Sequence, residues 1–199
     1  MRCVVLSALM MCLACIPLNG KAVLFYSTGD AAFNTNAPTG DLEGSGWQFQ
    51  GRFRNTSNDK YLGTALAPHH FITAKQISGV AIGETFTLNG ITYTTIAKIN
   101  DPGSDLTLWE IDGTFPGYAP LYSSADEEGK DLVVFGRGTQ RGDAVVANGD
   151  THGWKWGPKD FVVRWGENNV AGISDYAALG DDKLLRAEFN RGEGVNECM

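Results

Sequence analysis

GTALAPHHFITAKQISG, residues 63–79, contains the end of one apolar run and the whole of a second, separated by a short polar turn. The runs lie at Tyr61–Ala67 and Phe71–Ala74, and each has the length of a β-strand. Pro68-His69-His70 lies between them and predicts a turn, since proline cannot continue a central strand. The second run leads directly into Lys75 and Gln76.

The residues around this segment predict more short strands. Trp47, Phe49 and Phe53 alternate with polar residues, which predicts a half-buried strand over 47–53. Asn89-Gly90 separates two runs rich in threonine and aromatic residues, which predicts a two-residue hairpin. A turn at Asp101–Ser104 precedes a further strand at Leu106–Ile111. Short strands with turns between them indicate an antiparallel barrel or sandwich.

The second half has the same β character. Residues 114–130 are rich in proline, tyrosine, serine and acidic residues, which predicts a linker. No convincing helical period occurs along the chain. The strand-like runs of this half are 132–135, 144–147, 160–165 and 184–189.

The first 22 residues predict a signal peptide. Arg2 provides the positive start, Cys3–Ile16 is almost entirely apolar, and Gly20-Lys21-Ala22 offers small residues for cleavage. The apolar run is too short for an easy bilayer span, so we expect no stable membrane span. The expected location is secreted or periplasmic. Processing as a lipoprotein at Leu13-Ala14-Cys15 is the less favoured alternative.

The charge and the cysteine content argue against a nucleic-acid-binding protein and against a fold held by internal disulfides. The chain has 16 lysine and arginine residues against 23 acidic residues, a formal charge of −7, which argues against nucleic acid as a partner. Three of the four cysteines lie in the expected signal peptide, leaving Cys198. The rest of the chain therefore has no internal disulfide framework. It begins with an irregular N-terminal segment, residues 23–45.

Two motifs resemble those of the trypsin/chymotrypsin-like serine peptidases. That family reads Gly-Thr, apolar run, Ala-Pro, apolar run, Thr-Ala-Ala-His, and the final His is its general base. Here the matching tetrapeptide is Thr73-Ala74-Lys75-Gln76. Ser104–Leu108 is similar to the motif that carries the aspartate of the catalytic triad, at Asp105. The resemblance spans roughly 47–198.

The resemblance implies an all-β fold of two barrels with the active site between them. Residues 46–113 would form the first barrel, 114–130 the linker, and 131–199 a second barrel that is incomplete at the C-terminus. Gln76 would occupy the position of the base and Asp105 that of the residue that orients it.

The same resemblance implies loss of catalysis. A carboxamide cannot accept a proton near neutral pH, so Gln76 cannot act as a general base. The family's Gly-Asp-Ser-Gly-Gly string does not occur in the sequence. Residues 191–198 resemble the approach to that loop, and we expect a truncation before the nucleophilic serine. The expected function is that of an exported serine endopeptidase homologue, monomeric and without cofactor, which contacts a peptide or protein ligand.

Other interpretations of these residues remain open. Asp105 could simply close a turn by accepting backbone N–H groups. His69-His70 invites a metal site, but adjacent strand residues point to opposite faces and neither His152 nor another residue gives a third ligand at suitable spacing. We therefore expect no metal.

The second candidate function belongs to a different class, a secreted β-sandwich binding module. In that case Trp154, Trp156 and Trp165 would contact carbohydrate or protein. Packing is the favoured role for these three side chains, since large aromatic residues in β proteins usually fill a core.

Overall fold

The chain is mostly β-strand. The computed structural model describes residues 23–55, 58–77, 79–175, 183–189, 196 and 198. Its helical elements are two 3-10 turns, η1 (Gly40–Leu42) and η2 (Trp47–Phe49). Within the described residues, no helix is long and apolar enough to cross a bilayer. The predicted signal peptide, residues 1–22, lies outside the described residues.

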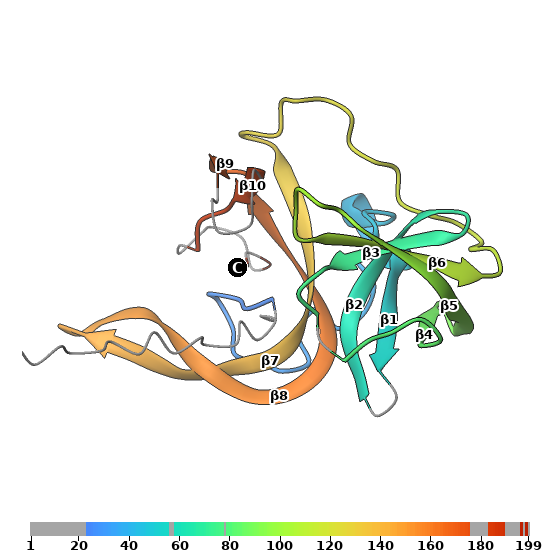
Figure 1. Cartoon of the computed structure of the whole chain (residues 1–199). Coiled ribbons are helices and arrows are strands. Elements are labelled where there is room, and N and C mark those ends of the chain that lie inside the picture. The colour runs from blue at the N-terminus through green and yellow to red at the C-terminus, as the bar shows by residue number, and fades with distance from the viewer. Residues whose placement is uncertain are drawn as a thin grey trace, which may run out of the picture.

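Six antiparallel strands close into a barrel (Figure 1). Neighbours pair in the order β1-β2-β3-β6-β5-β4, and β1 returns to β4. The all-β prediction and the closed antiparallel barrel in the first half are confirmed. The strands are β1 (Gln50–Asn55), β2 (Asn58–Ala67), β3 (His70–Ala74), β4 (Thr85–Leu88), β5 (Ile91–Asn100) and β6 (Leu106–Asp112).

The predicted strand over 47–53 is partly wrong, because β1 begins only at Gln50. Gly46 has a φ of 123°, and the Phe49 N–H donates to the Gly46 carbonyl at 3.0 Å, so the chain makes one 3-10 turn here. Trp47 packs edge-on against Phe135 of the second half, with ring centroids 6.1 Å apart. Trp47 fits the alternating spacing of a strand, but it lies in the 3-10 turn and contacts the second half of the molecule instead.

The predicted Asn89-Gly90 hairpin is confirmed. Both residues have positive φ, 50° and 81°, which a type I′ turn requires at its two central positions. The turn sets the register of β4 against β5, with Leu88 opposite Ile91 and Phe86 opposite Tyr93. Phe86 thereby points into the barrel, where it is fully buried.

Aromatic rings fill the barrel. Phe71 and Phe86 stack with ring centroids 3.9 Å apart and planes at 11°. Gly51 faces the same ring, and a Cβ atom there would lie 2.1 Å from Phe86 Cζ. A glycine in β1 is therefore what admits the stacked pair. The buried cluster comprises Phe53, Ala65, Phe71, Phe86, Leu88, Tyr93, Trp109, Ile111 and Phe115.

The second half forms a long curved ribbon of two strands, β7 (Asp131–Ala147) and β8 (Asp150–Asn169). Asn148 and Gly149, with φ of 53° and 88°, make the turn. The runs predicted at 132–135 and 144–147 thus lie in one strand. A separate pair, β9 (Gly172–Asp175) and β10 (Lys183–Arg186), lies beside it (Figure 1). No second barrel closes among residues 131–175 and 183–189.

Residues 23–36, called here the lead-in segment, lie against the inner side of the β7–β8 ribbon (Figure 1). Its first three residues, 23–25, are buried. Asn34 Nδ2 donates to the Trp165 carbonyl at 3.1 Å, and Trp165 Nε1 donates to the Asn36 carbonyl at 2.8 Å. Arg141 Nη1 donates to the carbonyls of Phe25 and Tyr26, both at 2.8 Å. Residues 25–36 of the irregular segment predicted at 23–45 are therefore held by bonds to residues far along the chain.

Candidate functional site

Gln76 and Asp105 are brought together by the pairing of β3 with β6. Ala74 lies opposite Leu106, and the next residues continue the contact: the Lys75 N–H donates to the Asp105 carbonyl at 2.8 Å. The Gln76 N–H then donates to Asp105 Oδ1 at 2.9 Å. The two positions singled out in the sequence are thus direct neighbours at one end of the barrel.

The loop before Asp105 is held by its own side chains and by Lys75. Asp101 Oδ2 accepts the Ser104 hydroxyl at 2.5 Å, and Asp101 Oδ1 accepts the Gly103 N–H at 3.2 Å. The Ser104 hydroxyl, with the Gly103 N–H, lowers the pKa of Asp101, which is exposed. Lys75 Nζ donates to the Asp101 carbonyl at 3.0 Å and to the Ser104 carbonyl. Lys75 therefore fixes the loop that carries Asp105, a role that sequence reasoning missed.

The chemistry of this pair is limited by the amide. Gln76 is exposed and Asp105 is half-buried. The carboxylate of Asp105 accepts a backbone N–H, as it also would in a simple turn closure. The Gln76 side chain is an amide, and an amide cannot carry a proton between a nucleophile and a leaving group.

The histidines do not form a metal site in the described part of the chain. No group of three or more His, Cys, Asp or Glu side chains gathers there. The exposed His69 bonds the Gly113 carbonyl through Nδ1 at 2.5 Å, while His70 is the first residue of β3. His152 lies in β8, in the other half of the molecule.

The three tryptophans of the second half differ in exposure. Trp165 is 8% exposed, and Trp154 is half-buried with its ring edge-on to Tyr26 at 5.1 Å. Arg141 lies over the Trp154 ring at 4.3 Å from its centroid. Trp156 is 52% exposed. Trp154 and Trp165 therefore pack, as favoured from sequence, and the three do not share one exposed platform.

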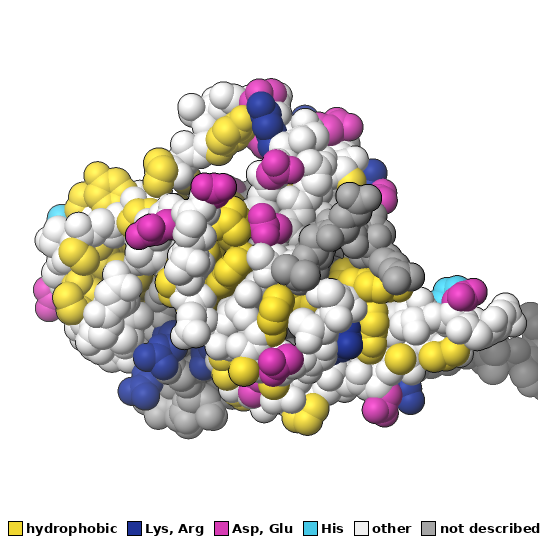
Figure 2. All heavy atoms as spheres, turned by 180° about the vertical axis from the view of Figure 1, so that it is seen from behind, with side chains coloured by type: hydrophobic (Ala, Val, Ile, Leu, Met, Phe, Trp, Pro, Cys, Tyr) yellow, Lys and Arg dark blue, Asp and Glu magenta, His cyan; other side chains and the backbone are white. Residues whose placement is uncertain are grey.

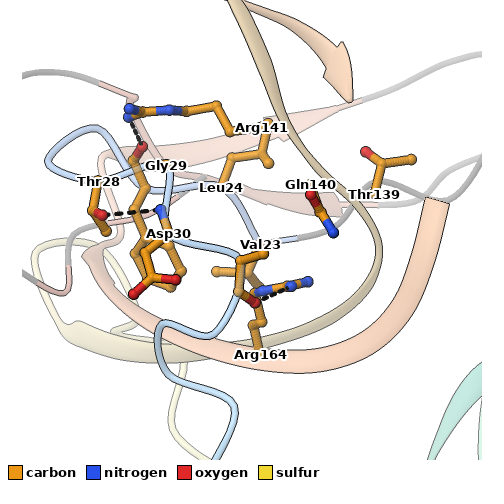
Figure 3. Close-up of a pocket in the computed structure, with 11 residues that line it drawn as sticks. Val23, Leu24, Thr28, Gly29, Asp30, Thr139, Gln140, Arg141 and Arg164 are labelled. Atoms are coloured by element: carbon orange, nitrogen blue, oxygen red, sulfur yellow. Dashed lines mark hydrogen bonds between the residues drawn. The ribbon is translucent and has the colours of Figure 1, made fainter. Parts of the chain in front are cut away.

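A second polar cluster lies between the lead-in segment and the ribbon (Figure 3), and sequence reasoning missed it. Arg164 is almost fully buried and pairs with Asp160 Oδ2 at 2.6 Å. It also donates to the Ala31 carbonyl of the lead-in segment. A charged residue inside the run Val162-Val163-Arg164-Trp165 is the sequence signal that could have indicated a buried ion pair.

The pKa of Asp160 is lowered by its contacts with Arg164 and the Val162 N–H. Burial raises its pKa, but hydrogen bonds from Arg164 and the Val162 N–H, with the attraction of the Arg164 charge, together outweigh burial. The net effect is a pKa below the ordinary value of 3.8. The small recess beside this pair is open and is lined by Val23, Leu24, Thr139, Gln140 and Arg141 among others (Figure 3). Arg141 and Arg164 donate to backbone carbonyls of the lead-in segment, whereas the buried hydroxyl of Thr139 has no hydrogen-bond partner among the described residues.

Neither family models nor curated proteins match this chain. Figure 2 shows acidic side chains scattered over the face it displays. Most of residues 191–198, which resemble the approach to a serine loop, lie outside the described residues; Cys198 is described and is buried.

Proposed function

We propose that this chain is an exported homologue of the trypsin-like serine endopeptidases that does not catalyse peptide hydrolysis. The position of Gln76 beside Asp105 is the observation that carries the proposal. The order along the chain is that of the family's base and aspartate, and the contact is direct, with the Gln76 N–H 2.9 Å from Asp105 Oδ1.

The strand pairing supports the proposal because it brings the two positions together at one end of the barrel. Gln76 follows β3 and Asp105 precedes β6, and these two strands are paired neighbours. A histidine at position 76 would have a carboxylate at hand to hold its ring and stabilise its charged form. The finer fold, in which residues 131–199 correspond to a second, incomplete barrel, is part of the same proposal.

Loss of activity follows from the side chain at position 76. Removing one member of a Ser-His-Asp triad leaves only the residual rate that the oxyanion hole and binding provide. Gln76 removes the base, and the sequence contains no Gly-Asp-Ser-Gly-Gly string to supply the nucleophile. The proposed role is therefore to contact a peptide or protein ligand without cleaving it.

We expect the purified protein to hydrolyse no substrate in a broad panel of fluorogenic peptides, because the Gln76 amide at the position of the base cannot take up the proton. An active trypsin-like enzyme measured in parallel is the positive control. The Asp105→Ala variant should give the same background rate as the parent chain. Turnover by the parent that disappears in Asp105→Ala would overturn the proposal, since it would show a working base at this site.

A further inference from the structure

The connection between the two halves of the molecule, residues 113–130, is exposed over most of its length. It leaves β6, arches away from the barrel and returns to β7 (Figure 1). Residues 120–126 are seven consecutive exposed positions. In the described chain, none of these seven residues makes a backbone hydrogen bond to another element.

Two large side chains with apolar surface, Leu121 and Tyr122, lie within this exposed stretch. Leu121 is 72% exposed and Tyr122 is 60% exposed. The Tyr122 hydroxyl donates to Asp126 Oδ1 at 2.6 Å, and Asp126 pairs with Lys130 at 3.2 Å. Contacts between exposed side chains of this kind are weak, so they do not prevent the segment from binding in another protein's groove.

We propose that the chain is cleaved in this connection, at the bond after Leu121 or after Tyr122, by an endopeptidase with an apolar primary pocket. Such enzymes bind an extended segment through its backbone groups and place one side chain in a pocket. Water adds across the peptide bond: the carbonyl of the residue before the cut becomes a carboxylate, and the following N–H becomes an amine.

Other exposed apolar residues are poorer sites because their backbones are engaged. Trp156, Leu184 and Leu185 lie in paired strands. Tyr118 is exposed and lies in the same connection, but the next N–H, that of Ala119, donates to the Ala65 carbonyl at 2.8 Å. The Tyr118–Ala119 bond is therefore fixed to β2, which makes Tyr118 a matched control.

The cut chain stays together. The lead-in segment precedes the cut in sequence, yet it packs on β7 and β8, which follow it. Arg141 holds the carbonyls of Phe25 and Tyr26, and Asn34 exchanges hydrogen bonds with the backbone around Trp165. The two fragments are thus joined through the lead-in segment without the peptide bond.

Brief digestion with chymotrypsin, followed by intact mass measurement, tests the site. We expect the first fragments to end at residue 121 or 122. The double variant Leu121→Ser/Tyr122→Ser should resist first cleavage by at least about ten-fold, toward the rate that requires unfolding, while Tyr118→Ser should be cut like the parent. First cleavage at another position in the parent chain, or unchanged cleavage in the double variant, would overturn the site.

Size-exclusion chromatography of the cut protein tests the second part. We expect both fragments to elute together in native buffer and to separate in urea. Arg141→Met should weaken this association in the cut protein, while the uncut variant elutes as the parent does. Fragments that separate in native buffer would contradict the role of the lead-in segment.

Discussion

Gly51→Ala is expected to destabilise the protein by about 3 kcal/mol, because overpacking a well-filled core costs this much when neighbours cannot move. The new methyl group would lie 2.1 Å from Phe86 Cζ and within 2.7 Å of two further ring atoms. The Phe86 ring cannot retreat, since it stacks on Phe71 at 3.9 Å and meets Phe115 edge-on at 5.6 Å. Urea unfolding followed by tryptophan fluorescence measures the change.

Two comparisons separate this steric effect from a general loss of glycine. Gly103→Ala is the control, because the nearest atom to its added Cβ is Asp101 Oδ1 at 4.0 Å, and its stability should match that of the parent. Phe86→Leu frees space beside position 51, so the double variant Gly51→Ala/Phe86→Leu should lose less than the sum of the two single losses. Strictly additive losses would show that the ring and the glycine do not compete for one volume.

Asp160→Asn is expected to cost about 3 kcal/mol at neutral pH, the low end for breaking a buried ion pair, because Asp160 keeps some exposure. The variant leaves the Arg164 charge, whose side chain is 4% exposed, without its carboxylate. The anchorage of the lead-in segment through the Ala31 carbonyl should weaken with it. Urea unfolding at pH 7 measures the cost.

The stability lost in Asp160→Asn should become smaller as the pH falls into the acid range. The folded-state pKa of Asp160 lies below 3.8, so the carboxylate adds stability above that value and loses its contribution as the pH falls through the folded pKa. The stability difference between parent and Asp160→Asn should therefore be constant from pH 7 to pH 5 and shrink below pH 4. A difference that stays the same into acid would exclude an ionised Asp160 as its source. Lys159 precedes Asp160 in the sequence and is exposed, so Lys159→Gln is the surface control. Its stability should differ little from that of the parent.

Local patterns predicted much of the barrel. Asn89-Gly90 indicated the hairpin because only residues that tolerate positive φ fit its turn. The apolar runs at 61–67 and 71–74 indicated β2 and β3, and the turn between them made these strands neighbours. The contact of Gln76 with Asp105 was also predictable, although only through the resemblance, because no local pattern shows that β3 pairs with β6.

The second half was predicted less well for a physical reason. Gly142 and Gly157 interrupt the apolar pattern of β7 and β8. These two glycines nevertheless allow the paired strands to approach each other closely. A Cβ at Gly142 would lie 2.7 Å from the Lys155 carbonyl oxygen, and one at Gly157 would lie 2.8 Å from that of Gln140. The strands therefore appeared shorter in sequence than they are.

The lead-in segment shows a different limit. Its residues carry no strand or helix period, and its structure comes from partners more than a hundred positions away, such as Trp165 for Asn34. Long-range bonds of this kind leave no local pattern. The same holds for Gly51, whose importance depends on Phe86 from β4.

Titration of a histidine placed at position 76 tests the proposed relation of this site to a catalytic base most directly. In Gln76→His the Asp105 carboxylate should favour the charged imidazole, so NMR should give its pKa above the usual value of about 6.5. In Gln76→His/Asp105→Asn that pKa should return to about 6.5. Equal pKa values in the two variants would contradict the account, since Asp105 would then not act on a base at this position.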